Sequence, residues 1–133
     1  MTPFEFFKND RYAAAAGIEL LEIAPGRARA RMEVRDAHLN AGGTVQGGAV
    51  FTLADLAFAA AVNASGTLAV SVEAGIRYFK SPGPGAMLLA DARVVNDHAK
   101  LPAYEVRVTD AAGVLVALFT ATAYRKKTPL PFA

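Results

Sequence analysis

The longest apolar stretch of the chain predicts a buried helix. Residues 44–66 read TVQGGAVFTLADLAFAAAVNASG, with paired glycines near the start and Ser-Gly at the end. Apolar residues fill most positions from about Gly47 to Ala64, and a helix that is apolar on nearly all sides needs other elements around it. One carboxylate, Asp55, stands in the middle of this helix, and its presence there needs an explanation.

Period-two patterns predict strands on both sides of the helix. Residues 18–23 and 28–34 flank the turn signal Ala24-Pro25-Gly26 and predict a hairpin. After the helix, four segments predict strands, at residues 70–79, 86–96, 104–109 and 114–124. Apolar and polar residues alternate in the first and third, and the last is largely apolar on both faces. In the first of these, the alternation places Ser71 and Ala74 on opposite faces. A short helix is expected at residues 3–10.

This order of elements indicates an α+β fold. It runs from a hairpin through one long helix to an expected four-stranded meander, and a single helix among many strands argues against a doubly wound sheet. The simplest way to enclose the helix is a curved antiparallel β-sheet wrapped around one long central α-helix. The 133 residues contain no linker or repeat, so we expect a single domain over residues 1–133.

Composition narrows the classes of function. The chain has no cysteine, which excludes a thiolate zinc site and a cysteine nucleophile. The net charge of +2 does not indicate nucleic-acid binding, and arginines at alternate positions in 27–35 are typical of a strand with one face in water. His38 and His98 belong to no metal-spaced cluster, so no metal or prosthetic group is expected. No apolar run reaches the roughly 20 residues of a membrane span, and no signal peptide is recognisable, so a cytoplasmic protein is the default expectation.

Asp55 has two interpretations from the residues alone. A buried, unpaired carboxylate is costly or takes up a proton, so Asp55 either pairs with an arginine or caps a backbone amide, or its chemistry is needed. Gly47 and Gly48 favour chemistry, because bare N–H groups at the positive end of a helix can polarise a carbonyl or hold an oxyanion. The amide of Asn40, seven residues before Gly47, can donate a hydrogen bond, although a turn residue is its simpler interpretation.

Gly47 and Asp55 are too far apart to act together within one chain. They are eight residues apart, which is roughly 12 Å along a helix. The two groups meet if two copies of the helix run antiparallel across a dimer axis, with Gly47 of one chain near Asp55 of the other. We therefore expect a homodimer with two composite sites. A dimer of dimers is also compatible, and the choice between dimer and tetramer stays open.

The residues around this helix resemble the signature of the PaaI-type hotdog-fold acyl-CoA thioesterases. The similarity lies in four segments: His38-Leu39-Asn40, Gly43-Thr44-Val45-Gln46-Gly47-Gly48, Phe51-Thr52-Leu53-Ala54-Asp55 and Ala57-Phe58-Ala59. It continues through the next strand and covers about residues 15–125. The resemblance implies a hotdog fold and the hydrolysis of an acyl- or aryl-CoA thioester to free acid and CoA.

The resemblance also implies roles for individual residues. Asp55 corresponds to the catalytic carboxylate, which attacks the thioester carbon or activates water. Gly47 corresponds to the glycine whose amide polarises the thioester carbonyl, and Asn40 to the side chain that helps to hold the carbonyl or water. Ser71 resembles a serine that positions water in some relatives, and an ordinary strand serine is an equally good interpretation.

One position departs from the family pattern. The family usually has His-Gly-Gly where this chain has Gln46-Gly47-Gly48, and glutamine does not titrate near neutral pH. If the histidine acts as an acid or base, that function is lost here. If it only shapes the loop, Gln46 is sufficient, and this second interpretation is the one we favour. Two other functions stay open: acyl-CoA binding without turnover, which Gln46 permits, and hydratase or dehydratase chemistry, whose Asp/His pattern the chain lacks.

The remaining candidates concern substrate binding. Gln46 and Gly48 border the helix start, and three aromatic residues are candidates for the acyl pocket, although each also suits core packing: Phe51, Phe58 and Tyr78. Arg77 and Lys80 are expected near the mouth of the site, where they would bind CoA phosphates. The expected partners are an acyl-CoA substrate and a second copy of the chain, with no nucleic acid and no membrane.

Overall fold

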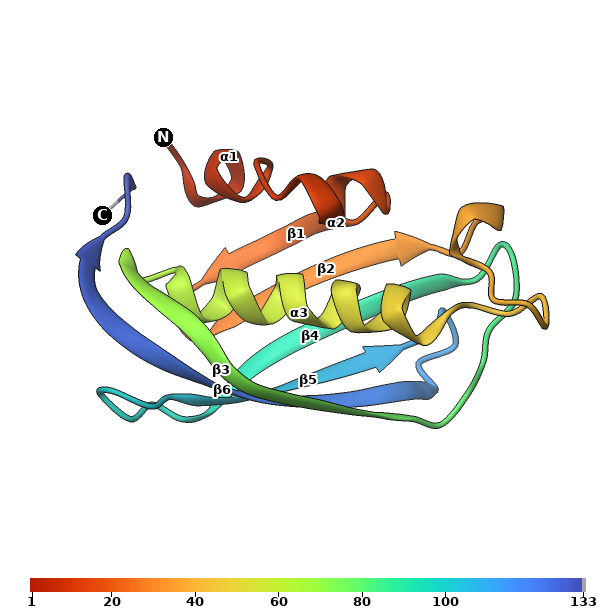
Figure 1. The fold of residues 1–133 in the computed structure, drawn as a ribbon. Coiled ribbons are helices and arrows are strands. Elements are labelled where there is room, and N and C mark those ends of the chain that lie inside the picture. Colours follow the sequence, from red (N-terminus) through yellow and green to blue (C-terminus); the bar gives the residue numbers. More distant parts are fainter. Residues whose placement is uncertain (133) are drawn as a thin grey trace.

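Six antiparallel strands form one curved sheet around a long helix (Figure 1). The computed structural model describes residues 1–132. The fold class predicted from the sequence, a curved antiparallel sheet with one long central helix, is confirmed. The strands are β1 (Glu19–Ala24), β2 (Arg27–Glu33), β3 (Thr67–Tyr78), β4 (Met87–Asn96), β5 (Ala103–Thr109) and β6 (Leu115–Pro129), and the helices are α1 (Pro3–Phe7), α2 (Arg11–Ala15) and α3 (Gly47–Asn63).

Helix α3 lies along the concave side of the sheet and forms the centre of the core. Its bounds agree with the prediction to within one residue. Ten of its residues are buried, and the ring of Phe58 packs against Tyr104 of β5 and Phe119 of β6. Alanines at several of the buried positions allow the helix to approach the strands closely. The helix is therefore enclosed, as its nearly continuous apolar pattern predicts.

The helix ends at a buried polar residue that hydrophobic periodicity does not identify. Asn63 donates hydrogen bonds from Nδ2 to the carbonyl oxygens of Ala59 at 2.9 Å and Ala69 at 3.2 Å. Its Oδ1 accepts the N–H of Ala69 at 2.8 Å. These bonds satisfy backbone groups where the helical pattern stops and β3 begins. Asn63 thus joins the end of α3 to the strand that follows it.

Strand β2 has the predicted alternation. Its alanines and the following apolar positions face the core, and its arginines lie on the outer face of the sheet. Arg31 pairs with Glu19 of β1 at 2.7 Å, and Arg27 and Arg29 each lie 3.9 Å from Glu22. The arginines therefore pair with acids of the neighbouring strand, which is how the solvent face of a sheet commonly balances its charge.

The expected four-stranded meander after the helix is wrong. Strands β4, β5 and β6 form a meander, but β3 pairs with β6 at the far edge, and β4 pairs with β2, giving the order β1-β2-β4-β5-β6-β3. Helix α3 connects β2 to β3 across the concave face, so residues 79–86 have to return the chain to β2 before β4 begins (Figure 1). Hydrophobic alternation identifies strands without identifying their neighbours, which explains the error.

Strand β3 is an edge strand that is exposed on both faces over most of its length. Val72 is 57% exposed, and the whole stretch from Val70 to Gly75 is exposed. A bulge between Ser71 and Glu73 adds one residue to β3 opposite β6. Ser71 therefore pairs with the buried Ala123 and shares a face with Ala74, whereas simple alternation places these two residues on opposite faces.

The helix predicted at residues 3–10 is present as the shorter α1, and a second short helix, α2, follows it where none is predicted. Thr2 and Glu5 form a capping box at the start of α1, and Asp10 caps α2 by accepting the N–H of Ala13 at 3.0 Å. Asp10 starts a new helix and so divides the segment. Both helices lie over β1 on the same side of the sheet as α3 (Figure 1). No helix in the described part of the chain has the length and apolar character to cross a membrane.

Replacing Asn63 with Ala should destabilise the fold. The substitution leaves the N–H and the carbonyl of Ala69 without their buried partner, which costs about 1–3 kcal/mol of unfolding free energy. Urea denaturation measures the change. Asn96→Ala, at an exposed position, is the control and should stay within about 0.5 kcal/mol of the parent. If the two variants prove equally stable, Asn63 does not have the role described here.

Candidate active site

Asp55 lies in the middle of α3 without a partner. Its side chain is half-buried, and within residues 1–132 its carboxylate takes part in no hydrogen bond or ion pair. Burial raises the pKa of Asp55 above its ordinary value, and the carboxylate of Asp10 raises it further. Neither the arginine pair nor the amide cap that would make Asp55 a structural residue is present in the described part of the chain.

The start of α3 presents one free backbone amide. Gln46 is the N-cap residue, and its side-chain oxygen accepts the N–H of Gly48. The N–H of Gly47 has no acceptor among residues 1–132. It stands at the positive end of a 17-residue helix, so it is available to an acceptor that comes from outside the chain.

Tyr78 of β3 packs against Gly47. Its hydroxyl donates a hydrogen bond to the carbonyl oxygen of Gly47 at 2.8 Å, and a Cβ at residue 47 would lie 3.0 Å from the ring. Glycine at this position therefore leaves room for the tyrosine. The sequence suggests Tyr78 for the acyl pocket, and its observed contact adds a function that sequence reasoning missed, which is to hold the Gly47 peptide in place.

Asn40 organises the loop that leads into α3. Its Oδ1 accepts the N–H groups of Gly42 at 2.9 Å and Thr44 at 3.2 Å, and its Nδ2 donates to the Thr44 hydroxyl at 3.2 Å. These are the contacts of a turn residue. A side-chain amide has two N–H donors, so one remains after the bond to Thr44. Asn40 is thus able to hold the loop and still donate one hydrogen bond outward.

His38 connects the same loop to the N-terminal helices. It is buried, its Nδ1 accepts the N–H of Arg35 at 3.0 Å, and its Nε2 lies 2.6 Å from the carbonyl oxygen of Ala16. Because Nδ1 is an acceptor here, the proton must be on Nε2, which donates to Ala16. The sequence places His38 in a family-like segment and in no metal-spaced cluster, and it does not identify these two structural hydrogen bonds.

One chain does not bring the four predicted catalytic residues together. Asn40 and Gly47 lie at the start of α3, whereas Asp55 lies roughly 12 Å further along the helix. Ser71 stands on the exposed edge strand β3, on the face that its pairing with buried Ala123 turns toward the core side. The chain therefore carries two separate half-sites, one with a free amide and one with an unpaired carboxylate.

The two phenylalanines predicted to line the acyl pocket lie in the core. Phe51 is partly buried, with its ring packed edge-on against Phe119 at 5.2 Å. Phe58 is only 2% exposed and contacts Tyr104 and Phe119. Phe58 is therefore a core residue and does not line the proposed acyl pocket.

The two basic residues predicted for CoA binding lie at the end of β3. Lys80 forms an ion pair with Asp110 at 2.9 Å, and the hydrogen bond from Lys80 holds the pKa of Asp110 below its ordinary value. Arg77 is exposed and pairs in register with Leu118 of β6. Lys80 thus already has a carboxylate partner, which a phosphate would have to replace.

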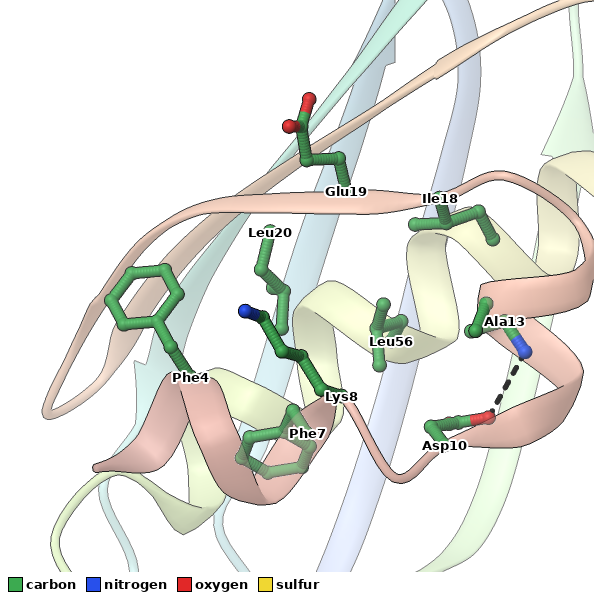
Figure 2. A pocket seen from close by; sticks show the side chains of 10 residues that line it. Phe4, Phe7, Lys8, Asp10, Ala13, Ile18, Glu19, Leu20 and Leu56 are labelled. Carbon is green, nitrogen blue, oxygen red and sulfur yellow. Dashed lines mark hydrogen bonds between the residues drawn. The ribbon is translucent and has the colours of Figure 1, made fainter. Parts of the chain in front are cut away.

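Two cavities border α2 and α3. A cavity of about 400 Å³ lies beside the start of α3 and includes Gln46, Gly48 and Thr52 in its wall. A second cavity, of about 240 Å³, lies between α1, α2, the start of β1 and Leu56 of α3 (Figure 2). Within residues 1–132, no group of three histidine or acidic side chains is placed to hold a metal ion.

Comparison with known proteins agrees with the fold and with the family that the sequence resembles. The model of the thioesterase superfamily matches residues 42–117. The acyl-coenzyme A thioesterase PaaI of Escherichia coli K12 is 32% identical to this chain, and the alignment covers 90% of this chain and 85% of the relative. The structure of E. coli PaaI, from the phenylacetic acid degradation operon, superposes with a TM-score of 0.91 over 95% of this chain and 91% of the PaaI chain. A putative esterase of Archaeoglobus fulgidus is 39% identical over 94% of this chain and 81% of its own.

A further solved structure contains a ligand. It is smu.793 from Streptococcus mutans UA159, bound to acetyl CoA, with 30% identity and a TM-score of 0.80 over 84% of this chain and 90% of its own. The matched segment and the shared fold define a thioester hydrolase of the thioesterase superfamily. Within that superfamily the chain belongs to the PaaI-type hotdog thioesterases.

Replacing Asp10 with Asn should lower the pKa of Asp55. The change removes a negative charge near the carboxylate, while asparagine still caps α2. Burial is the larger cause and remains, so the pKa should fall only part of the way to its ordinary value of 3.8. NMR titration of the Asp55 carboxyl carbon measures the shift.

Asp36→Asn is the matched control for this titration, because Asp36 is an exposed acid that does not contribute to the raised pKa of Asp55. It should leave the titration of Asp55 unchanged. Equal shifts in the two variants, or no shift with Asp10→Asn, would show that the charge of Asp10 does not act on Asp55.

Proposed function

We propose that the protein hydrolyses an acyl-CoA thioester to the free acid and CoA, with Asp55 as the base or nucleophile. The observation that carries the proposal is the half-buried Asp55 carboxylate, which has a raised pKa and no partner in residues 1–132. A group of this kind is common at sites of chemistry. Support for the substrate class comes from the E. coli relative, an acyl-coenzyme A thioesterase, and from the S. mutans relative, which binds acetyl CoA.

In the proposed mechanism, the N–H of Gly47 donates a hydrogen bond to the thioester carbonyl oxygen. The amide and the positive end of α3 stabilise the negative charge that forms on this oxygen when the carbonyl carbon is attacked. The free N–H of Asn40 donates a second hydrogen bond to the carbonyl or to water. The side-chain oxygen of Gln46 accepts the N–H of Gly48, so the N–H of Gly47 is the donor at the helix start that remains for the substrate.

Asp55 acts on the other side of the carbonyl carbon. As a base it removes a proton from water, and the hydroxide adds to the carbon; as a nucleophile it forms an anhydride that water then cleaves. In both routes the carbon–sulfur bond breaks and CoA leaves as the thiolate. Ser71 is proposed to position the water. A thioester-cleavage assay that detects free thiol, applied to short, medium, long and aryl acyl-CoAs, tests the proposed reaction.

The proposed active unit is a homodimer. The roughly 12 Å between Gly47 and Asp55 prevents one chain from placing both groups on one carbonyl. Two antiparallel α3 helices would place Gly47 of one chain beside Asp55 of the other. The exposed edge of β3, with Val72 in its centre, supports this arrangement, because an unpaired apolar edge favours pairing with another strand. A dimer of dimers is compatible with the same sites.

CoA binding is assigned to the outer end of β3. Arg77 and Lys80 are the basic residues there, and phosphates favour such groups at the mouth of a site. Lys80 would exchange its partner Asp110 for a phosphate. Because the ion pair with Asp110 is exposed, its loss costs little.

Asp55→Asn should abolish most of the activity. The amide has the size of the carboxylate but neither accepts a proton nor attacks the thioester, so kcat should fall by a factor of the order of 10²–10⁴. Release of free thiol from acyl-CoA measures the loss. Asp97→Asn, at an exposed position, is the control and should keep parental activity. Activity of Asp55→Asn within a few-fold of the parent would remove Asp55 from the mechanism.

Gln46→His tests the departure from the family pattern. In the structure Gln46 caps the Gly48 amide, which is a positioning function, so histidine should change kcat by less than about tenfold. The contrary result is a gain of the order of 10²–10⁴, the effect of an added acid or base, with a new titration near a pKa of ~6.5. That gain would mean that the natural chain is mainly an acyl-CoA-binding protein.

A further inference from the structure

The cavity beneath the N-terminal helices is mainly apolar. It has a volume of about 240 Å³, and its apolar wall comes from α1, α2, α3 and the start of β1, namely Phe4, Phe7, Ala14, Ile18, Leu20 and Leu56. Figure 2 shows Leu20 and Glu19 leaving β1 on opposite sides, so that Leu20 points into the space beside Leu56. An apolar cavity of this kind gains free energy when an apolar group replaces water in it.

The charged groups of the same cavity balance each other. Asp10 contributes one carboxylate to the lining and Lys8 one ammonium group (Figure 2). Glu19 leaves β1 on the other side, where its carboxylate pairs with Arg31 at 2.7 Å. The cavity therefore suits an uncharged apolar group.

The cavity lies next to the proposed reacting position. Leu56, in its wall, directly follows Asp55 on α3, and Asp10 is close enough to Asp55 to influence its charge. The larger cavity beside the helix start is lined by the polar side chains of His38, Gln46 and Thr52 and by small apolar residues, mostly alanines. The smaller cavity is the one whose wall consists mainly of large apolar side chains.

The helices that cover the cavity are anchored by their neighbours. Each has five residues, too few to be stable alone. The ring of Phe6 packs edge-on against Phe7 at 5.1 Å and against Phe132 at 5.6 Å, and Ala13 of α2 is buried. Helices α1 and α2 are therefore held in place by packing against the rest of the fold.

We propose that this cavity holds the acyl group of the substrate, so that α1 and α2 determine which acyl groups are accepted. The proposal rests on the proposed function and adds the substrate class: thioesters of uncharged, apolar acyl groups whose length is limited by the wall at Ala14 and Leu20.

Adjacent alanines of α2 provide a matched test. Ala14 and Ala15 are both exposed, but Ala14 lines this cavity and Ala15 lines the larger one. Each buried methylene contributes about a factor of four to binding, so Ala14→Phe should lower the ratio of kcat/KM for hexanoyl-CoA to that for acetyl-CoA about tenfold or more. Ala15→Phe should leave this ratio unchanged. Leu20→Ala, which enlarges the cavity, should raise the ratio for octanoyl-CoA over hexanoyl-CoA.

The opposite pattern overturns the proposal. If Ala15→Phe changes the chain-length ratio and Ala14→Phe does not, the acyl group lies in the larger cavity; if neither does, it lies in neither cavity. Failure of the proposed function is a different result, in which the parent protein releases no thiol from any acyl-CoA. In that case, calorimetry of the binding of ethyl-, hexyl- and octyl-CoA thioethers to the same variants tests the cavity without turnover. If the affinity of Ala14→Phe depends on chain length as that of the parent does, the proposal is again contradicted.

Discussion

The enclosure of α3 by the sheet is the constraint on which the rest of the molecule depends. Packing against the six-stranded sheet leaves the helix one region that is not covered by its own sheet, and this region carries Asp55. The short helices α1 and α2 lie over the same side, which partly buries the carboxylate and raises its pKa. On a solvent-exposed helix the same side chain would titrate near its ordinary value, whereas here burial gives Asp55 the raised pKa on which the proposed mechanism depends.

The rigidity of the helix also sets the distance between the two half-sites. A free amide at its first residue and a carboxylate eight residues later are held roughly 12 Å apart, and no side-chain movement brings them to one carbonyl. The same residues explain the need for glycine at position 47, because Tyr78 occupies the space where a side chain would begin. In the proposed dimer this fixed separation becomes useful, since antiparallel helices bring each amide to the carboxylate of the other chain.

Much of this arrangement is predictable from the sequence. The apolar run predicts α3 almost to the residue, alternation predicts β2 and β5 because each has one buried face, and the turn signal at residues 24–26 predicts β1 as the partner of β2. The strand order is not predictable this way, because alternation carries no information about neighbours, and β3 pairs with β6 instead of β4. The bulge at Ser71–Glu73 also escapes prediction, since one inserted residue changes the face of Ser71 without changing the composition of the strand.

The candidate site is predictable to a similar extent. Asp55 and Gly47 are conspicuous in sequence, because a carboxylate within an apolar helix and glycines at a helix start are unusual. Whereas the cap that Gln46 provides is a local contact with Gly48, the functions of His38 as a link to Ala16 and of Tyr78 as a support for Gly47 depend on contacts between distant segments. The same is true of the cavity beneath α1 and α2, whose wall combines residues from the N-terminal segment and from α3.

Activity of mixed dimers tests the central claim most directly. Asp55→Asn removes the carboxylate, and Gly47→Pro removes the amide N–H at the first helical position, where proline is well tolerated and where the extended Gln46 already has a compatible backbone. A Cβ at residue 47 would lie 3.0 Å from the Tyr78 ring, so the proline requires a shift of this half-exposed ring by a few tenths of an ångström. If each site takes Gly47 from one chain and Asp55 from the other, exchanging subunits between the two inactive variants should restore about a quarter of parental activity, because half of the dimers then carry one intact site. Native mass spectrometry verifies that mixed dimers have formed. If the mixture is then no more active than the two variants measured separately and added together, the composite site is contradicted.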